Sequence, residues 1–222
     1  MHRKKAEIIT IKKLRKDGSL CKETMDRIYR SVLNREIVVM PTDSVYGIIT
    51  LGMSDLRQRF SEITNWAETK FVRLISSFKM LGNIASINKF EYDFLNRIWP
   101  GEVTVLLKNV MDDVHNDEDN RIAVRFPKIR FLHELIDLIG DPLLLMDALN
   151  GRGITLCRRK DIVDAFNDRA DLILIVEELC RKYPSCSCVD ISTDCLKIIE
   201  EGKVCSEEIR SLYFLGKADD VV

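Results

Sequence analysis

The chain has 222 residues, of which 46% are apolar and 31% are charged, a composition that fits a folded domain and excludes the disordered class. Its 34 basic and 35 acidic side chains give a formal net charge of −1, so whole-molecule electrostatics do not favour nucleic acid or anionic lipid. No apolar run reaches the roughly 18 residues that cross a bilayer, and no signal-peptide core follows the basic N-terminus, so we expect a cytoplasmic protein without membrane contact.

Predicted helices and strands alternate along the chain. Residues 1–20 form a basic arm with an edge strand over residues 8–14, followed by a single domain over residues 21–215 and a short tail over residues 216–222. The predicted helices cover residues 22–34, 55–64, 86–98 with Ser86 as the N-cap, 129–139, 161–167, and a short stretch that Ser206 caps. The predicted strands cover residues 37–40, 71–75, 103–107, 122–126, 143–146, 172–176, 188–191 and 196–199, and an acidic loop covers 111–120.

Connection lengths decide the type of sheet. Several predicted strands are separated by too little chain for a crossover helix, which parallel neighbours require. We therefore predict an α/β fold, with an open twisted mixed sheet and helices packed against it.

Five of the seven cysteines fall between residues 180 and 205, which raises the question of a zinc site. That region contains no histidine and no C-x-x-C pair, the ligand spacing typical of zinc sites. We therefore expect reduced thiols and no structural metal. The seven cysteines are Cys21, Cys157, Cys180, Cys186, Cys188, Cys195 and Cys205.

Polar side chains gather directly after the predicted strand that ends at Met40. Thr42, Ser44 and Tyr46 follow this strand, and Gly47 permits a turn that a Cβ would obstruct. Ligands of open α/β sheets bind at strand ends, where polar side chains and free N–H groups converge. The pattern indicates a ligand site here; the alternative is a turn whose hydroxyls bond within the turn.

Three motifs make the chain resemble the YrdC/YciO family. They read P-T-D-S-V-Y-G at residues 41–47, W-P-G-E-V-T at 99–104 and R-F-P at 125–127, in the family's order and spacing. The match can be followed from about residue 30 to about residue 210, and it implies a YrdC-like sheet. Members look like threonylcarbamoyl-AMP synthases, which combine L-threonine, bicarbonate and ATP with Mg²⁺ by nucleotidyl transfer. Their product feeds modification of an adenosine in the tRNA anticodon loop, and members are also described as binding RNA.

The resemblance assigns roles to individual residues. It implies Thr42, Ser44 and Tyr46 at an L-threonine pocket and Arg125 near a carboxylate or phosphates, where a guanidinium makes fork-shaped contacts. The implied nucleotide contacts are Lys70, Thr104, Asp147, Asn150 and Ser187. Three alternatives remain open: Tyr46 as a core residue with a bonded hydroxyl, Arg125 in an ion pair with a helix, and Trp99 in core or lid packing.

The chain departs from the family where phosphates are held. The family's K-x-R becomes Thr64 and Trp66, its S-A-N turn becomes D-A-L at residues 147–149, and its late arginine becomes Glu200. Its S-T-V-V-D strand becomes C-S-C-V-D at residues 186–190, which keeps one hydroxyl. One lost charged contact costs about 1.5–3 kcal/mol, so several together disfavour ATP binding in the family's usual pose.

Two hypotheses follow. An enzyme, a diverged synthase, would need a replacement phosphate cluster of Lys70, Arg73 and Arg125. A non-catalytic RNA- or protein-binding module on the same fold is supported by the lost cations, by the basic arm and by R-R-K at residues 158–160. We favour a diverged member with weak or absent synthase activity that keeps a role in binding RNA, tRNA or a nucleotide.

Overall fold

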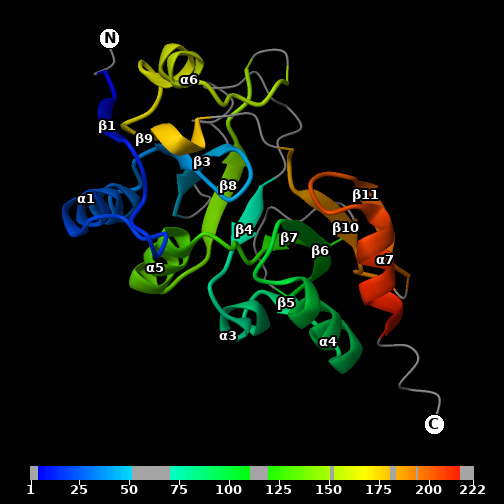
Figure 1. The fold of residues 1–222 in the computed structure, drawn as a ribbon. Helices are drawn as coiled ribbons and strands as arrows, with labels where there is room; N and C mark the ends of the chain where they lie inside the picture. Colours follow the sequence, from blue (N-terminus) through cyan, green and yellow to red (C-terminus); the bar gives the residue numbers. More distant parts are fainter. Residues whose placement is uncertain are drawn as a thin grey trace. The chain divides into compact units, whose positions relative to one another are not determined.

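The structure, a computed structural model, describes residues 5–51, 71–110, 120–150, 153–180, 184–193 and 195–215 (Figure 1). The chain divides into two compact units, each built from two separate segments. Unit 1 comprises Met1–Phe71 and Ile129–Tyr183, and unit 2 comprises Val72–Lys128 and Pro184–Val222. Within the described ranges every helix is too short for a bilayer crossing, since the longest has 12 residues. The domain boundaries at residues 20 and 215 stay predictions.

Unit 1 contains a five-stranded mixed sheet. Its strands, in spatial order, are β1 (Glu7–Ile11), β9 (Leu172–Val176), β2 (Val38–Pro41), β3 (Tyr46–Thr50) and β8 (Leu143–Asp147). Strand β9 runs parallel to both β1 and β2, whereas β3 is antiparallel to both β2 and β8. The mixed sheet is thereby confirmed for this unit. Strand β1 lies at its edge and ends at Ile11, three residues before the predicted end at residue 14.

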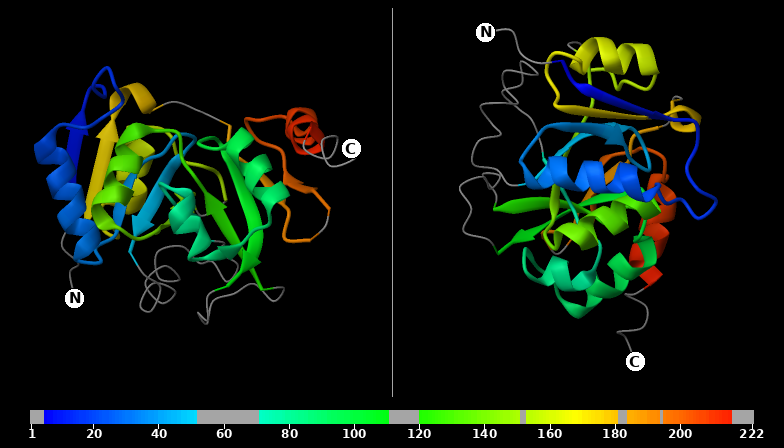
Figure 2. Two further views of the ribbon diagram at one scale, coloured as in Figure 1. Left: turned by 90° about the horizontal axis from the view of Figure 1, so that it is seen from below. Right: turned by 90° about the vertical axis from the view of Figure 1, so that its left-hand side faces the viewer.

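Helices pack against this sheet, as Figure 2 shows from two further sides. They are α1 (Lys22–Leu33), α5 (Arg130–Ile139), α6 (Arg159–Phe166) and the 3₁₀ turn η1 (Glu177–Leu179). Helix α6 buries Ile162 and Phe166 in a cluster with Val39 and Tyr46. Because side chains alternate along a strand, Met40 and Gly47 belong to the opposite sheet face.

Unit 2 contains a second mixed arrangement of strands. Its strands, in spatial order, are β4 (Val72–Leu74), β7 (Arg121–Arg125), β6 (Val103–Asn109), β10 (Ser187–Asp190) and β11 (Lys197–Glu200), and β5 (Ala85–Ser86) pairs with β6. Strand β4 is parallel to β7 and β10 is parallel to β6, whereas the pairs β6–β7 and β10–β11 are antiparallel. The helices are α3 (Phe78–Gly82), α4 (Lys89–Ile98) and α7 (Ser206–Leu215).

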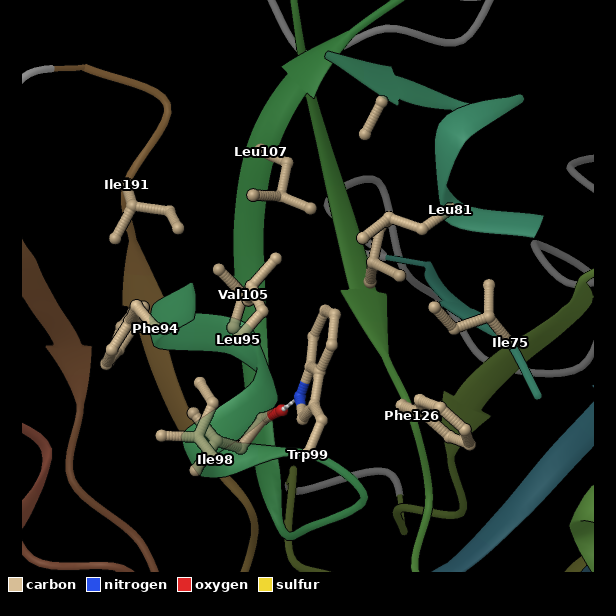
Figure 3. Packing of buried hydrophobic residues seen from close by; sticks show 14 of the residues in the cluster. Ile75, Leu81, Phe94, Leu95, Ile98, Trp99, Val105, Leu107, Phe126 and Ile191 are labelled. Atoms are coloured by element: carbon tan, nitrogen blue, oxygen red, sulfur yellow. Dashed lines mark hydrogen bonds between the residues drawn. The ribbon is translucent and has the colours of Figure 1, made fainter. Parts of the chain in front are cut away.

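All three helices of unit 2 contribute to one apolar core, part of which Figure 3 shows. Val105 and Leu107 of β6 share this core with Phe94 of α4, and the ring of Phe94 packs nearly perpendicular to that of Tyr213 of α7. Trp99 is 5% exposed, and its indole N–H donates to the carbonyl oxygen of Val103 at 2.8 Å (Figure 3). Trp99 is therefore a core residue, one of the alternatives that the sequence left open.

Some predicted boundaries were wrong for identifiable reasons. Ser86 does not cap α4 but lies in β5; Asn88 is the cap, and its capping box with Glu91 fixes the first turn. Strand β3 and helix α3 were not predicted. The predicted helix over residues 55–64, most of the acidic loop over residues 111–120, and Thr64, Trp66 and Lys70 lie outside the described residues.

Candidate functional site

The turn between β2 and β3 is held by the hydroxyl of Thr42. This hydroxyl donates to the carbonyl oxygen of Val45 at 2.7 Å and accepts the N–H of Ser44 at 3.2 Å. The Ser44 hydroxyl lies 3.3 Å from it, and both residues are buried, at 5% and 3% exposed. The structure therefore brings Thr42 and Ser44 together, and much of their hydrogen-bonding capacity serves the turn itself.

Gly47 creates a bare patch of backbone beside this turn. A Cβ there would overlap Cδ1 of Leu145 and would lie 3.4 Å from Cγ2 of Thr42. Asp147 is the register partner of Gly47 on β8, so its side chain belongs to the same sheet face. Thr42 and the half-buried Asp147 thus flank Gly47, a polar corner at the end of the strands of unit 1.

Replacing Gly47 by alanine is expected to lower the free energy of unfolding by about 1–3 kcal/mol, because the new methyl group overpacks against Leu145. Urea unfolding monitored by circular dichroism measures the loss. Gly82→Ala is the matched control, since a Cβ there meets nothing within 4 Å. Equal stability of the two variants would contradict the close packing at Gly47.

Tyr46 points to the other face of unit 1. It is 2% exposed, and its hydroxyl accepts the N–H of Val176 at 3.1 Å and lies 3.3 Å from Sγ of Cys180. Burial, together with the hydrogen bond to Cys180, raises the pKa of the Tyr46 phenol, so it is neutral at every physiological pH. This placement matches the alternative of a core tyrosine with a bonded hydroxyl.

Asn150 lies in a turn after β8. Its Oδ1 accepts the N–H of Ile154 at 3.0 Å, and its carbonyl oxygen accepts the N–H of Gly153 at 2.9 Å. The described contacts of the Asn150 side-chain oxygen thus stabilise a turn. The role of Asn150 as a nucleotide contact stays a prediction.

Unit 2 presents a polar sheet face opposite its apolar core. Val105, Val124 and Val189 point into the core, so their neighbours along the strands point the other way. Leu106 and Ala123 lie on this second face, together with polar side chains. We name the polar residues among them the polar face: Thr104, Arg121, Arg125, Cys188 and Asp190.

Two arginines of β7 reach across β6 to the segment that contains β10. Nη1 of Arg121 lies 3.0 Å from Oδ2 of Asp190, and Nη1 of Arg125 donates to Sγ of Cys186 at 2.7 Å. Arg125 is 2% exposed, and Thr104, which is 6% exposed, is the register partner of Cys188. The sequence interpretation missed the Arg121–Asp190 and Arg125–Cys186 pairs, although the spacing of four residues between the arginines places both on one face of a strand.

The replacement phosphate cluster fails on strand geometry. Arg73 pairs with Val124, whereas Leu74 pairs with Arg125, so Arg73 shares the core face and Arg125 shares the polar face. The guanidinium groups of Arg73 and Arg125 therefore do not converge on one face of the unit 2 sheet.

The hydroxyl of Ser187 is fully committed to a turn of unit 2. It donates to the carbonyl oxygen of Val204 at 2.6 Å and accepts the N–H groups of Gly202 at 3.0 Å and Val204 at 3.2 Å. One donor and two lone pairs are all that a serine hydroxyl has, so none remains for a ligand in this conformation. Glu200, just before this turn, accepts the hydroxyl of Ser185 at 3.3 Å.

Comparison with known proteins gives a family match over most of the chain. A family model named for Sua5, YciO and YrdC, and described as telomere recombination, matches residues 31–202. Comparison with curated proteins gives no match.

Solved structures share the fold. Escherichia coli YciO superposes with a TM-score of 0.78 at 18% identity, over 92% of this chain and 99% of that one. Sua5 of P. abyssi, solved with L-threonine, gives a TM-score of 0.78 at 19% identity, over 93% of this chain and 61% of that one. HypF in a phosphate- and nucleotide-bound form gives 0.69 at 11% identity, over 80% of this chain and 29% of that one. The YrdC-like mixed-sheet fold is confirmed, and this chain spans about three fifths of the Sua5 chain that it matches.

Proposed function

Because the chain belongs to the Sua5/YciO/YrdC family, we propose that it is a diverged relative of the threonylcarbamoyl-AMP synthases with little or no synthase activity. In this proposal it keeps the family fold for a binding role toward RNA or a nucleotide. The observation that carries the proposal is the turn of unit 2 at residues 200–204, where an acidic residue replaces the expected arginine and the remaining serine hydroxyl is consumed internally.

Among the residues that the structure describes, the candidate nucleotide contacts fit ATP with Mg²⁺ poorly. Polyphosphate recognition needs fixed cations or free donors around several negative charges. Two of these positions instead hold the carboxylates of Asp147 and Glu200, and the hydroxyl of Ser187 already makes all of its hydrogen bonds within the protein. Arg73 lies on the sheet face opposite the polar face of unit 2. We therefore derive no catalytic step through ATP.

L-Threonine is the ligand of the Sua5 structure that the chain resembles, and a similar small acid stays a candidate here. Thr42 and Ser44 support it weakly, because their hydroxyls already bond within the β2–β3 turn. Arg125 supports it more, because a guanidinium on the polar face can pair with a carboxylate.

Isothermal titration of the full chain with ATP and Mg²⁺ tests the proposal. We expect no measurable heat from ATP at concentrations up to about 1 mM, a limit that corresponds to about 4 kcal/mol of binding free energy. Glu200→Arg, which restores the expected charge, is the informative variant: a gain of ATP binding would show that the lost cation is decisive. Micromolar binding by the wild-type chain would contradict the proposal.

RNA binding is the second candidate, and the exposed basic side chains after β1 favour it. Lys12, Lys13, Arg15 and Lys16 are exposed on the segment that follows this edge strand. When such an arm contacts the phosphates of RNA, the logarithm of the binding constant falls linearly with the logarithm of the salt concentration. Replacing Lys12, Lys13, Arg15 and Lys16 by glutamine is expected to weaken binding to a tRNA and to flatten its salt dependence, measured by fluorescence anisotropy. Salt-independent or undetectable binding by the wild-type chain would exclude this candidate.

A further inference from the structure

Strand β1 forms an exposed edge of the unit 1 sheet. It stands at the end of the strand order, and among the described strands its pairing partner is β9. The right-hand view of Figure 2 shows this strand, in dark blue, between α6 and α1. Every residue of the strand is exposed or half-buried, and Ile8 is 40% exposed. An edge strand of this kind is a template on which another strand can pair.

Alternate residues of β1 direct their backbone groups away from β9. The N–H of Glu7 donates to the carbonyl oxygen of Asp171 at 3.0 Å, and the parallel register with β9 continues unbroken from Glu7 to Ile11. In a parallel pair every second residue bonds to the neighbouring strand, so Ile8 and Thr10, which follow a bonded residue, face outward. Two N–H groups and two carbonyl oxygens therefore lie along the outer edge of β1.

Exposed lysines flank this edge at both ends. Lys5 precedes the strand, and Lys12 and Lys13 follow it. The segment after the strand is fixed to η1, because the carbonyl oxygen of Lys12 accepts the N–H of Glu178 at 3.1 Å and the N–H of Leu14 donates to the Glu178 carboxylate at 2.7 Å. These contacts hold the two following lysines beside the end of the strand.

The acidic side chains of β1 and η1 do not cancel this positive charge. Glu7 pairs with Arg27 at 2.8 Å, and Glu177 lies 3.8 Å from Arg159. Glu178 therefore faces a surplus of basic side chains. The exposed basic residues of this segment are Lys5, Lys12, Lys13, Arg15 and Lys16.

We propose that the outer edge of β1 binds an extended acidic peptide segment of a partner protein, which adds a strand to the unit 1 sheet. The backbone of this segment pairs with Ile8 and Thr10, and its acidic ends meet Lys5 and Lys12. At about 3.3 Å per residue these two lysines are about 23 Å apart along the strand, so the segment has about eight residues. The proposal does not depend on any synthase activity.

Two other occupants suit this edge less well. A second copy of the chain, paired so that Ile8 bonds to Thr10 of the other copy, places Lys5 opposite Lys13 of that copy, and like charges directly opposite are destabilising. RNA phosphates match the lysines, but they cannot bond to the outward carbonyl oxygens, which accept hydrogen bonds as phosphates do. An extended acidic peptide offers backbone donors, backbone acceptors and negative charge together.

Fluorescence anisotropy of a labelled peptide, E-D-V-T-V-T-V-D-E, with the full chain tests the proposal. Two further peptides carry N-methyl groups on the backbone, one at the valines and the other at the threonines. One of these patterns blocks the peptide edge that faces β1, and we expect it to weaken binding at least about tenfold, while the other pattern changes it little. Equal binding of the three peptides, or no binding of the unmethylated one, would overturn the proposal.

Amide hydrogen exchange locates the bound peptide. In the free chain we expect the outward amides of Ile8 and Thr10 to exchange faster than those of Ile9 and Ile11, which face β9. Saturation with the unmethylated peptide should slow exchange at Ile8 and Thr10 about tenfold or more. Peptide binding without this protection would show attraction by charge alone, and a tRNA that protects both amides when the peptide does not would show an RNA site; either result would contradict the proposal.

Charge-reversed variants test the role of the lysines. Lys12→Glu combined with Lys13→Glu is expected to weaken binding of the unmethylated peptide about tenfold, since two attractions become repulsions. Lys79→Glu combined with Lys89→Glu is the matched control, because both lysines are exposed on helices of unit 2. We expect the control to bind the peptide nearly as the wild type does. Equal weakening by both pairs would mean that net charge, and not the edge of β1, attracts the peptide.

Discussion

Replacing Arg121 by methionine is expected to lower the free energy of unfolding at pH 7 by about 3 kcal/mol, because it leaves a buried carboxylate without its cation. The side chain of Asp190 is 1% exposed and that of Arg121 is 23% exposed, and their charged atoms are 3.0 Å apart. Urea unfolding gives the loss. Arg130→Met is the control: its ion pairs with Asp17 and Glu134 lie at the surface, and their removal should cost less than 1 kcal/mol.

The same pair predicts a pH dependence with a definite sign. Burial raises the pKa of Asp190, but hydrogen bonds from the hydroxyl and the N–H of Ser192, together with Arg121, lower it more, so the pKa lies below its usual value of 3.8. A carboxyl whose pKa is depressed by folding stabilises the folded state fully above pH 3.8, and this contribution disappears as the pH falls through the folded pKa. Without Arg121 the pKa of Asp190 rises, so the stability difference between the wild type and Arg121→Met should shrink between pH 5 and pH 3. A difference that stays constant over this range would contradict the assignment.

Gly202→Ala is expected to cost about 2–4 kcal/mol of unfolding free energy, more than Gly47→Ala, because the new methyl group meets backbone. A Cβ at Gly202 would overlap the carbonyl oxygen of Ser185 and would lie 2.6 Å from the carbonyl carbon of Cys186 and 2.7 Å from the nitrogen of Ser187. A backbone cannot yield as the tip of a leucine does, so the turn must move.

Hydrogen exchange locates the damage that Gly202→Ala should cause. Displacement of the turn breaks the bond from the Gly202 N–H to the Ser187 hydroxyl, and we expect faster exchange of the Gly202 and Val204 amides than in the wild type. Ser187→Ala should accelerate the same two amides without introducing a clash. Unchanged protection of both amides in Gly202→Ala would mean that the turn is looser than its contacts indicate.

The sequence predicted those parts of the fold that local patterns encode. The apolar runs that became β8 and β9 were found, because a short continuous apolar run bounded by breakers is typical of a buried strand. Strand β3 was missed because its first two residues, Tyr46 and Gly47, end a motif that was interpreted only as a ligand site. The N-cap of α4 was misplaced by two residues because Ser86 and Asn88 are both good caps, and only the capping box with Glu91 distinguishes them.

The candidate site was harder to predict because its chemistry depends on strand phase and distant partners. A run such as V-R-L does not reveal which face of the sheet its arginine occupies. Only the register with β7 shows that Arg73 and Arg125 lie on opposite faces of the sheet. The hydroxyl of Ser187 is consumed by residues 15 and 17 positions away, which no local motif encodes. The family motifs therefore predicted the fold well, while the roles of individual side chains required the structure.

A pyrophosphate-release assay tests the central claim most directly. The full chain is incubated with ATP, Mg²⁺, L-threonine and bicarbonate, and release is compared with and without L-threonine. We predict no L-threonine-dependent release, because acidic or internally saturated groups stand where the family's phosphate contacts are expected. Multiple turnovers that require L-threonine would contradict the account and would show that this chain is a working synthase.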